Sequence, residues 1–239
     1  MIGRFHEVSV HAPDLLASLA FYERLGFMQV TAGEAFAYPY AVVADGRLAI
    51  GLHGHELLQS PLLSFVLPGL LERLETLERR GIEILERRLG NDVFNEASLE
   101  AGGQTLRLLE ARTHSPASLG PGETSRLGWF EEYALPVGDL KDAEAAFERL
   151  GFVPAEEGDQ PYPHIGMTSD SLNVALIGTG SLKRPALVFT DAAMHTRIAE
   201  LRESGIEFAR RPPAGLDADR HALLVAPEGT QLLLVTSDA

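Results

Sequence analysis

The chain has 239 residues, 45% of them hydrophobic, so it is long enough to bury the core of one large domain or of two ordinary ones. Its formal net charge of −14 excludes the basic surface that non-specific nucleic-acid binding requires, and no apolar run approaches the roughly 20 residues of a membrane-spanning helix. The absence of cysteine excludes disulfides, a thiolate nucleophile and a cysteine-based zinc site. The first residues, MIGRFHEV, lack the features of a signal peptide, and we therefore expect a cytoplasmic protein.

Strand and helix signals alternate along the first half of the chain. Polar and apolar residues alternate over residues 7–12 and predict a strand, and Asp14 is a suitable N-cap for a helix that ends near Leu25. Between Leu70 and Arg80, leucines recur at the spacing of one buried helix face and predict a second helix. Two further strands are expected at residues 48–52 and 105–108.

The second half of the chain repeats the first. Residues 6–27 read HEVSVHAPDLLASLAFYERLGF and residues 131–152 read EEYALPVGDLKDAEAAFERLGF, so that Asp14 aligns with Asp139. A third helix is therefore predicted after Asp139 and a fourth near residues 194–201. Each of the four helices is followed by a glycine, the residue expected where a helix ends in left-handed backbone: Gly26, Gly81, Gly151 and Gly205. The chain thus contains four strand–helix units, of which the first and third fit a β-α-β-β-β order most clearly.

A segment without periodicity separates the two halves. Residues 114–126 (HSPASLGPGETSR) are rich in proline, glycine and serine, which predicts a linker. We therefore expect a first domain at residues 1–112, a linker at 113–127 and a second domain at 128–239, with two units in each domain. The sequence leaves open whether the units pair within each half or across the halves.

The repeated motif resembles the signature of the vicinal oxygen chelate superfamily, which includes glyoxalases, bleomycin-resistance proteins and extradiol dioxygenases. Residues 14–27 follow the pattern Asp-Leu-x-x-Ser-Leu-x-Phe-Tyr-x-x-Leu-Gly-Phe. Residues 139–152 keep the Asp-Leu start and the Leu-Gly-Phe end, and residues 227–229 resemble the family's Asp-Pro-x-Gly turn. The resemblance implies an α+β fold in which four βαβββ modules pair into two open, cup-shaped mixed β-sheets with helices on the outside.

The resemblance also indicates where the family's metal ligands would lie. These positions fall on Glu7, Gly51, Leu62 and Arg107 in the first half and on Glu132, Ala175, Ala186 and Leu233 in the second. A divalent ion needs several His, Asp or Glu side chains that converge on one point. Each half supplies a single carboxylate at these positions, and Arg107 would repel a cation. We therefore expect no metal and no other cofactor.

Two carboxylates at these positions are candidate functional residues. The family geometry would bring the first strand of one module beside the last strand of its partner, so we expect Glu7 and Arg107 to form a bidentate ion pair at the floor of the first cup. This pair is either a structural salt bridge or a site at which Arg107 holds an anionic ligand. Glu132 is a candidate catalytic base, because a carboxylate beside alanines and a leucine must be solvated, protonated or paired with another group.

Histidine and aromatic side chains complete the predicted site. His11 and His53 share the cup-facing parity of Glu7, and His164 takes the place of Tyr40 in the second copy of the repeat. Each is either a ligand contact or a satisfied structural residue. Four residues are candidates for an aromatic wall or for the core: Tyr38, Tyr40, Tyr162 and Trp129. The predicted ligand-binding residues are Glu7, His11, Tyr40, His53, Arg107, Glu132 and His164.

The sequence favours a metal-independent small-molecule-binding protein of the drug- or metabolite-binding kind. One alternative is a divergent glyoxalase- or dioxygenase-like lyase, isomerase or oxygenase that uses an unpredicted metal site or a Glu or His general base. A second is a non-catalytic structural or interaction module. We expect a small-molecule ligand, no nucleic-acid or membrane partner, and a monomer or homodimer, since four modules complete both cups within one chain.

Overall fold

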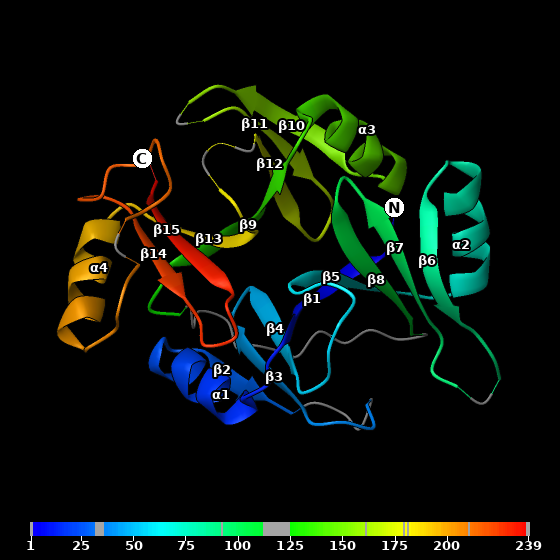
Figure 1. Cartoon of the computed structure of the whole chain (residues 1–239), viewed down its shortest axis with the longest axis horizontal. Helices are drawn as coiled ribbons and strands as arrows, with labels where there is room; N and C mark the ends of the chain where they lie inside the picture. The colour runs from blue at the N-terminus through cyan, green and yellow to red at the C-terminus, as the bar shows by residue number, and fades with distance from the viewer. Residues whose placement is uncertain are drawn as a thin grey trace.

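Each half of the chain forms one mixed β-sheet (Figure 1). The computed structural model describes residues 2–31, 36–91, 93–111, 125–160, 162–178, 180, 182–209 and 211–237. The first sheet has eight strands in the order β2-β3-β4-β1-β5-β8-β7-β6, and the second has seven in the order β10-β11-β12-β9-β13-β15-β14. Modules therefore pair within each half. They join through their first strands, which run antiparallel: β1 (Arg4–His11) with β5 (Leu62–Leu67), and β9 (Trp129–Val137) with β13 (Ala186–Asp191).

The first half contains two complete βαβββ modules. The first module continues from β1 through α1 (Leu15–Arg24), β2 (Met28–Val30), β3 (Tyr40–Asp45) and β4 (Leu48–His53). The second continues from β5 through α2 (Leu70–Arg79), β6 (Glu83–Arg88), β7 (Glu96–Ala101) and β8 (Gln104–Glu110). In both modules the last strand returns parallel to the first, so β1 pairs with β4 and β5 pairs with β8. The second module is thus more regular than its sequence pattern predicts.

The second half repeats this plan with one departure. The third module consists of β9, α3 (Leu140–Leu150), β10 (Val153–Gly158), β11 (His164–Thr168) and β12 (Asn173–Gly178). The fourth consists of β13, α4 (Met194–Glu203), β14 (Ala222–Val225) and β15 (Gln231–Thr236). Between α4 and β14, the described residues 206–209 and 211–221 contain no strand. The predicted α+β fold of two open mixed sheets is confirmed, and over the residues that the structure describes its fourth module has one strand fewer than the other three.

The repeated motif fixes both ends of the first helix in each half. Asp14 accepts a hydrogen bond from the Ala17 backbone nitrogen at 3.0 Å, and Asp139 caps α3 in the same way. Where these helices end, Gly26 and Gly151 have φ angles of 89° and 99°, in a region that other residues adopt only with strain. The motif therefore contains the residues that cap both ends of α1 and α3.

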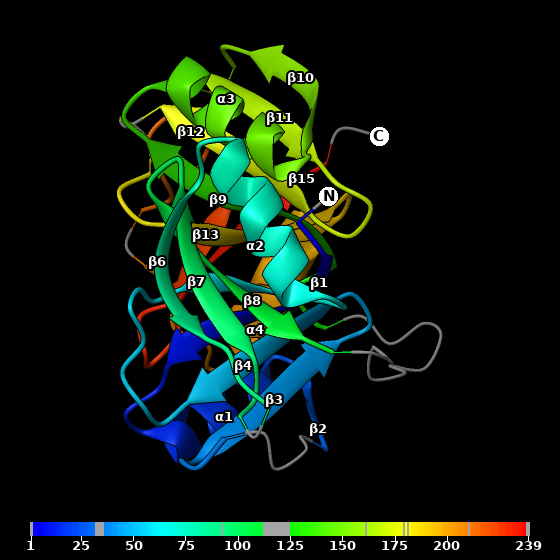
Figure 2. The ribbon, with the colours of Figure 1, turned by 90° about the vertical axis from the view of Figure 1, so that its right-hand side faces the viewer.

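One hydrophobic core joins the two halves. The apolar stripes of all four helices and one face of each sheet belong to a single cluster of buried side chains. Rings from the two halves meet in it, with centroids 6.3 Å apart for Phe27 and Phe189 and 6.4 Å apart for Phe65 and Phe152. Because side chains alternate along a strand, the opposite face of each sheet points away from this core, and we call it the cup face. The helices therefore lie outside the cups, as Figure 2 shows for α2 against β6 and β8.

The turn before the last strand of each half docks on the first helix of the other half. Glu228, in the turn before β15, accepts hydrogen bonds from the Ser18 and Tyr22 hydroxyls of α1, both at 2.7 Å. Gly102, in the turn before β8, lies so close to α3 that a Cβ atom there would be 3.2 Å from the Phe147 ring. The duplicated architecture thus produces two reciprocal contacts that hold the halves together.

The predicted linker lies largely outside the described residues, so the domain boundaries remain a prediction. The described residues that follow it are packed: Leu127 is fully buried, and the Arg126 backbone nitrogen donates to the Leu25 oxygen at 2.9 Å. In the part of the chain that the structure describes, no helix is both long and apolar enough to cross a membrane.

Candidate functional site

A bulge in β1 turns Glu7 and Ser9 toward the cup face of the first sheet. The pairing of β1 with β5 shifts register between Phe5 and Glu7, so that Phe5 packs against the core while Glu7 faces the cup. Val8 is fully buried in the core, as the alternation requires. Glu7 is nevertheless only 1% exposed, because the polar side chains around it shield it from solvent.

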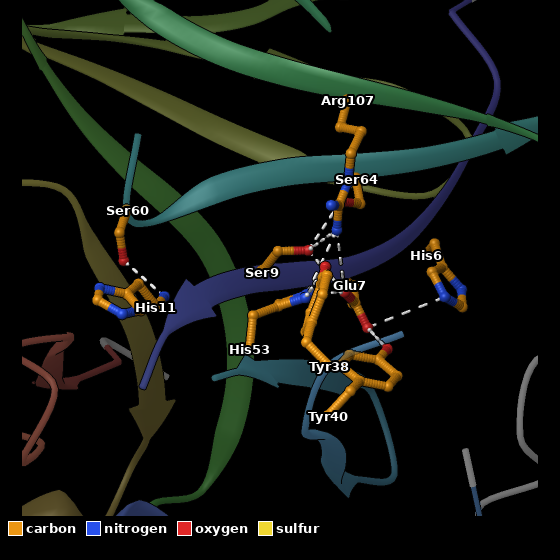
Figure 3. Close-up of polar contacts among 10 residues, drawn as sticks. All are labelled: His6, Glu7, Ser9, His11, Tyr38, Tyr40, His53, Ser60, Ser64 and Arg107. Carbon is orange, nitrogen blue, oxygen red and sulfur yellow. Dashed lines mark hydrogen bonds and ion pairs between the residues drawn. The ribbon is translucent and has the colours of Figure 1, made fainter. Parts of the chain in front are cut away.

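The Glu7 carboxylate receives hydrogen bonds from three side chains (Figure 3). Its Oε1 accepts from the Ser9 hydroxyl at 2.6 Å and lies 3.1 Å from His53 Nε2. Its Oε2 accepts from the Tyr40 hydroxyl at 2.5 Å. A Cβ atom at Gly51, on the neighbouring strand, would overlap the carboxylate. Glycine at this position therefore leaves the space in which Glu7 lies.

Arg107 reaches the same carboxylate from β8. Its Nη2 lies 3.8 Å from Glu7 Oε1 and donates to Ser9 Oγ at 3.0 Å, while its Nε donates to Ser64 Oγ at 3.3 Å. The predicted ion pair is confirmed, but it is one long contact in place of the expected bidentate bond. The expected strand arrangement is wrong, because β5 lies between β1 and β8. Ser64 occupies the central position expected for Leu62, since both Glu7 and Arg107 pair with it across the sheet.

Burial and hydrogen bonding act on the pKa values of this cluster. Burial raises the pKa of Glu7, but the hydrogen bond from His53 and the charges of His6 and His53 lower it, and the resulting pKa is about 2. Burial lowers the pKa of His53 and raises the pKa values of Tyr38 and Tyr40. At neutral pH the cluster therefore contains a carboxylate, a guanidinium, a neutral imidazole and neutral phenols.

A cleft of about 1550 Å³ opens beside this cluster. Phe36 and Tyr38 form an aromatic wall with ring centroids 5.0 Å apart, and Tyr38 also stacks on His55 at 5.1 Å. The Arg107 guanidinium carbon lies 5.4 Å from the Phe36 ring. The charged residues that line the cleft are Glu56, Glu86, Arg87, Arg88, Glu96 and Arg107. The cleft thus presents a flat aromatic surface next to charges of both signs.

The cluster does not fit the divalent metal that the resemblance implies. Among the described residues, no group of three or more His, Cys, Asp or Glu side chains is placed to hold a metal ion. The floor of the first cup supplies Glu7 and His53, while the Arg107 guanidinium approaches the same carboxylate oxygen that faces His53. The guanidinium thus provides a fixed positive charge where a cation would have to lie.

The second cup has an apolar floor. The positions that correspond to Ser9, Gly51, Ser64 and Arg107 are Ala134, Ala175, Val188 and Leu233. Val188 occupies the position expected for Ala186, because it pairs with both Glu132 and Leu233. These apolar residues form a separate cluster against which Tyr162, Leu216, Leu223 and Val235 pack.

Glu132 lacks the partners that surround Glu7. Its half-buried carboxylate forms no hydrogen bond or ion pair with the residues that the structure describes. Burial, together with the charges of Glu131 and Glu156, raises its pKa to about 7. Nearby, His164 Nδ1 lies 3.0 Å from the Tyr162 backbone oxygen and His164 Nε2 lies 3.9 Å from Glu156.

The structure divides the predicted ligand-binding residues between the cups. Four of them converge in the first cup, namely Glu7, Tyr40, His53 and Arg107, whereas Glu132 and His164 lie in the second. His11 belongs to neither group. Its ring points away from Glu7 in Figure 3, and its backbone nitrogen donates to Ser60 Oγ at 3.0 Å.

Three residues of the first site lie outside the predicted set: Ser9, Ser64 and Phe36. Ser9 alternates with Glu7 on β1, and Ser64 is the lone hydroxyl in the apolar run LLSFVL, so strand parity gave a usable signal for both. For Phe36 the sequence gave no such signal, because this residue lies outside the strands. Of the predicted aromatic wall, Tyr38 lines the cleft, whereas Trp129 is 45% exposed and lies under the Arg47 guanidinium.

No protein-family model matches the sequence, and a comparison with curated proteins finds no match. The structure, however, is similar to solved dioxygenase structures. A catechol 2,3-dioxygenase matches with a TM-score of 0.66 and 15% identity over 98% of this chain and 88% of the other. A substrate complex of homoprotocatechuate 2,3-dioxygenase from Brevibacterium fuscum matches with a TM-score of 0.66 and 16% identity over 99% and 81%. The 2,3-dioxygenase LapB from Pseudomonas sp. KL28 matches with a TM-score of 0.64 and 12% identity over 99% and 92%.

Proposed function

We propose that this chain, which has the vicinal oxygen chelate fold of the extradiol dioxygenases, is a cytoplasmic protein that binds a small drug or metabolite without a metal ion. The cleft of the first half carries this proposal. Its volume of about 1550 Å³ exceeds the several hundred Å³ of an ordinary ligand pocket, so it can admit an organic molecule. Fold likeness at this level of identity supports the architecture alone, and the function rests on the site.

The composition of the cleft supports a ligand with a flat apolar part and a polar group. The stacked rings of Phe36 and Tyr38 offer a face for the flat part. Arg107 lines the cleft as well as the cluster, so its guanidinium offers hydrogen-bond donors and a positive charge to a ligand that enters the cleft. Because Glu7 already balances the charge of Arg107, the polar group can be neutral or anionic.

Differential scanning fluorimetry with a panel of small phenols, aromatic carboxylates and aromatic amides tests this proposal. We expect at least one compound to raise the melting temperature of the wild type equally with and without EDTA. At a concentration about 100 times Kd, binding adds about 2.7 kcal/mol to the stability of the folded state. R107Q and F36A should weaken this effect at least about tenfold in apparent Kd, which corresponds to about 1.4 kcal/mol.

F36A leaves the contact between Arg107 and Glu7 in place and therefore separates loss of binding from loss of folding. R149Q, which changes an exposed arginine on α3, is the matched control and should bind like the wild type. Binding that requires an added divalent ion, or binding that is unchanged in both cleft variants, would overturn the proposal.

Two alternatives differ from this proposal in what they require of the cleft. A purely structural module would have its cups filled by its own side chains, and the second cup tends that way, since four further apolar side chains pack against its floor. The open cleft of the first half favours binding over that alternative. An enzyme that uses a histidine or glutamate as general base would need a hydroxyl or a substrate group in contact with that base. In the first cup, the Tyr38 hydroxyl lies 3.1 Å from His53 Nδ1.

A further inference from the structure

We infer that Tyr38, His53 and Glu7 form a hydrogen-bonded relay that makes the Tyr38 hydroxyl a nucleophile toward electrophilic carbonyl compounds in the cleft. The Tyr38 hydroxyl lies 3.1 Å from His53 Nδ1, and His53 Nε2 lies 3.1 Å from Glu7 Oε1. A hydroxyl, an imidazole and a carboxylate in this order form the arrangement that activates a hydroxyl in acyl-transfer enzymes. The inference concerns the same cleft as the proposed function but goes beyond binding.

Burial places the three groups as such a relay requires. Tyr38 is half-buried and lines the cleft, so its side chain lies beside a molecule bound there. His53 is completely buried and Glu7 is 1% exposed, so no bulk water replaces their contacts. Figure 3 shows the side chains of Glu7, from β1, and His53, from β4, pointing toward one another, with Tyr38 beside them.

The surrounding donors fix the tautomer of His53. Glu7 is ionised at neutral pH and can only accept hydrogen bonds, so the imidazole nitrogen that faces it must carry the proton. Nδ1 then holds a lone pair and accepts from the Tyr38 hydroxyl. Arg107 Nη2 also lies 3.3 Å from His53 Nε2, but it has a nearer acceptor in Ser9 Oγ at 3.0 Å. His53 Nε2 therefore donates to Glu7, and His53 Nδ1 accepts from the Tyr38 hydroxyl.

The charges around Tyr38 determine when it reacts. Burial raises its pKa, and Arg107 lowers it through charge and a hydrogen bond, while Glu96 and Glu7 raise it. The resting hydroxyl is therefore neutral and requires His53 as base when it attacks. His55 also stacks on the Tyr38 ring, with ring centroids 5.1 Å apart. Arg107 is placed to stabilise negative charge that develops on the attacked carbonyl oxygen.

The reaction with the probe 4-nitrophenyl acetate illustrates the step. The Tyr38 oxygen forms a bond to the carbonyl carbon, and its proton passes to His53 Nδ1. The bond to 4-nitrophenolate then breaks, and the leaving group departs with its electron pair. The product is acetylated Tyr38, and the imidazolium returns its proton to water. No oxidant, reductant or metal ion takes part.

The test is stopped-flow detection of 4-nitrophenolate together with mass spectrometry of the acetylated peptides. We expect a stoichiometric burst, with acetyl label on Tyr38. Y38F should abolish the burst, and H53Q should slow it at least about 100-fold, the usual contribution of a general base. The burst rate of the wild type should fall as pH decreases and His53 becomes protonated. Since Glu7 acts through His53, E7Q should slow the burst and move this pH midpoint downward.

Y162F is the matched control. Tyr162 occupies the position of Tyr38 in the second half, where the Nδ1 of the adjacent histidine faces the tyrosine's own backbone oxygen. This variant should retain the full burst. Label distributed over several tyrosines, a burst that persists in Y38F, or an H53Q rate within about threefold of wild type would overturn the relay. Absence of label with intact ligand binding rejects the relay alone, whereas label without ligand binding rejects the proposed function alone.

Discussion

Glu7 and Glu132 occupy the same place in the two copies of the repeat, yet their surroundings shift their pKa values in opposite directions. Hydrogen bonds and nearby positive charge outweigh burial at Glu7 and leave its pKa at about 2. At Glu132, burial and two neighbouring carboxylates raise the pKa to about 7. Opposite shifts imply opposite effects of pH on the stability of the folded state.

Glu7 should stabilise the fold above pH 4.5, its ordinary pKa, and lose this contribution as the pH falls toward about 2. The reason is that the unfolded chain binds the proton more readily than the folded chain in this range. The full contribution is on the order of 3 kcal/mol, since each pKa unit corresponds to about 1.4 kcal/mol. Urea unfolding of wild type and E7Q between about pH 3 and 7 measures it. The wild type should lose its advantage over E7Q at the acidic end, and parallel curves would contradict this expectation.

Glu132 should behave in the reverse sense. Its raised pKa means that the folded chain binds the proton more readily between pH 4.5 and about 7, so stability is lost as the pH rises through this range. E132Q, which is neutral at every pH, should therefore be more stable than the wild type at about pH 8 and equal to it near pH 4.5. Melting temperatures across this range test the prediction. E148Q changes an exposed glutamate of α3 and should leave the pH profile unchanged.

At the scale of elements, the turn that carries Glu228 is the contact most open to test. The Tyr22 hydroxyl is completely buried and donates to Glu228 at 2.7 Å, so E228A leaves this donor without its acceptor. We expect a loss of about 2 kcal/mol in the free energy of unfolding, measured in urea. In a double-mutant cycle, Y22F should cost less in the E228A background than in the wild type. Strictly additive losses would show that the contact does not couple the two halves.

Elements that carry a local signal could be predicted from the sequence. The N-caps at Asp14 and Asp139 and the glycines after the helices fixed α1 and α3, because capping depends on neighbouring residues only. The absence of a strand from the described residues 206–209 and 211–221 was not predicted specifically, since strand formation depends on pairing partners distant in sequence.

The candidate site follows the same division. The cup-facing parity of Glu7 and His53 could be read along single strands, and the structure brings both into the first cluster. Leu62 was expected at the central position that Ser64 occupies, because the register of this strand depends on its pairing with β1 and β8 and not on its own sequence. The order of β1, β5 and β8 could not be predicted from the sequence either. The length of the single contact between Glu7 and Arg107 depends on this order and was therefore not predicted.

Across the whole molecule, the core is shared while the cups differ. The cluster of buried side chains on the helix side spans both sheets, so its packing constrains both halves at once. The cup faces are free of that constraint, and their side chains differ. The first half has a charged, hydrogen-bonded floor beside an open cleft, whereas the second has alanine, valine and leucine near the Glu132 carboxylate, whose pKa is raised. A binding function is therefore expected to depend on the first cup, although the second half is required to complete the core.

The shared core predicts a single unfolding transition. Two independent domains would melt separately, but exposing the core of one half here also exposes apolar surface of the other, as the ring contacts between Phe65 and Phe152 illustrate. Scanning calorimetry should therefore give one peak whose van't Hoff enthalpy equals the calorimetric enthalpy. L77A in α2 and L201A in α4, both truncations of buried side chains, should each lower the midpoint of that one peak, with losses of about 2–5 kcal/mol. If either variant instead splits the peak in two, the halves fold independently and the core does not couple them.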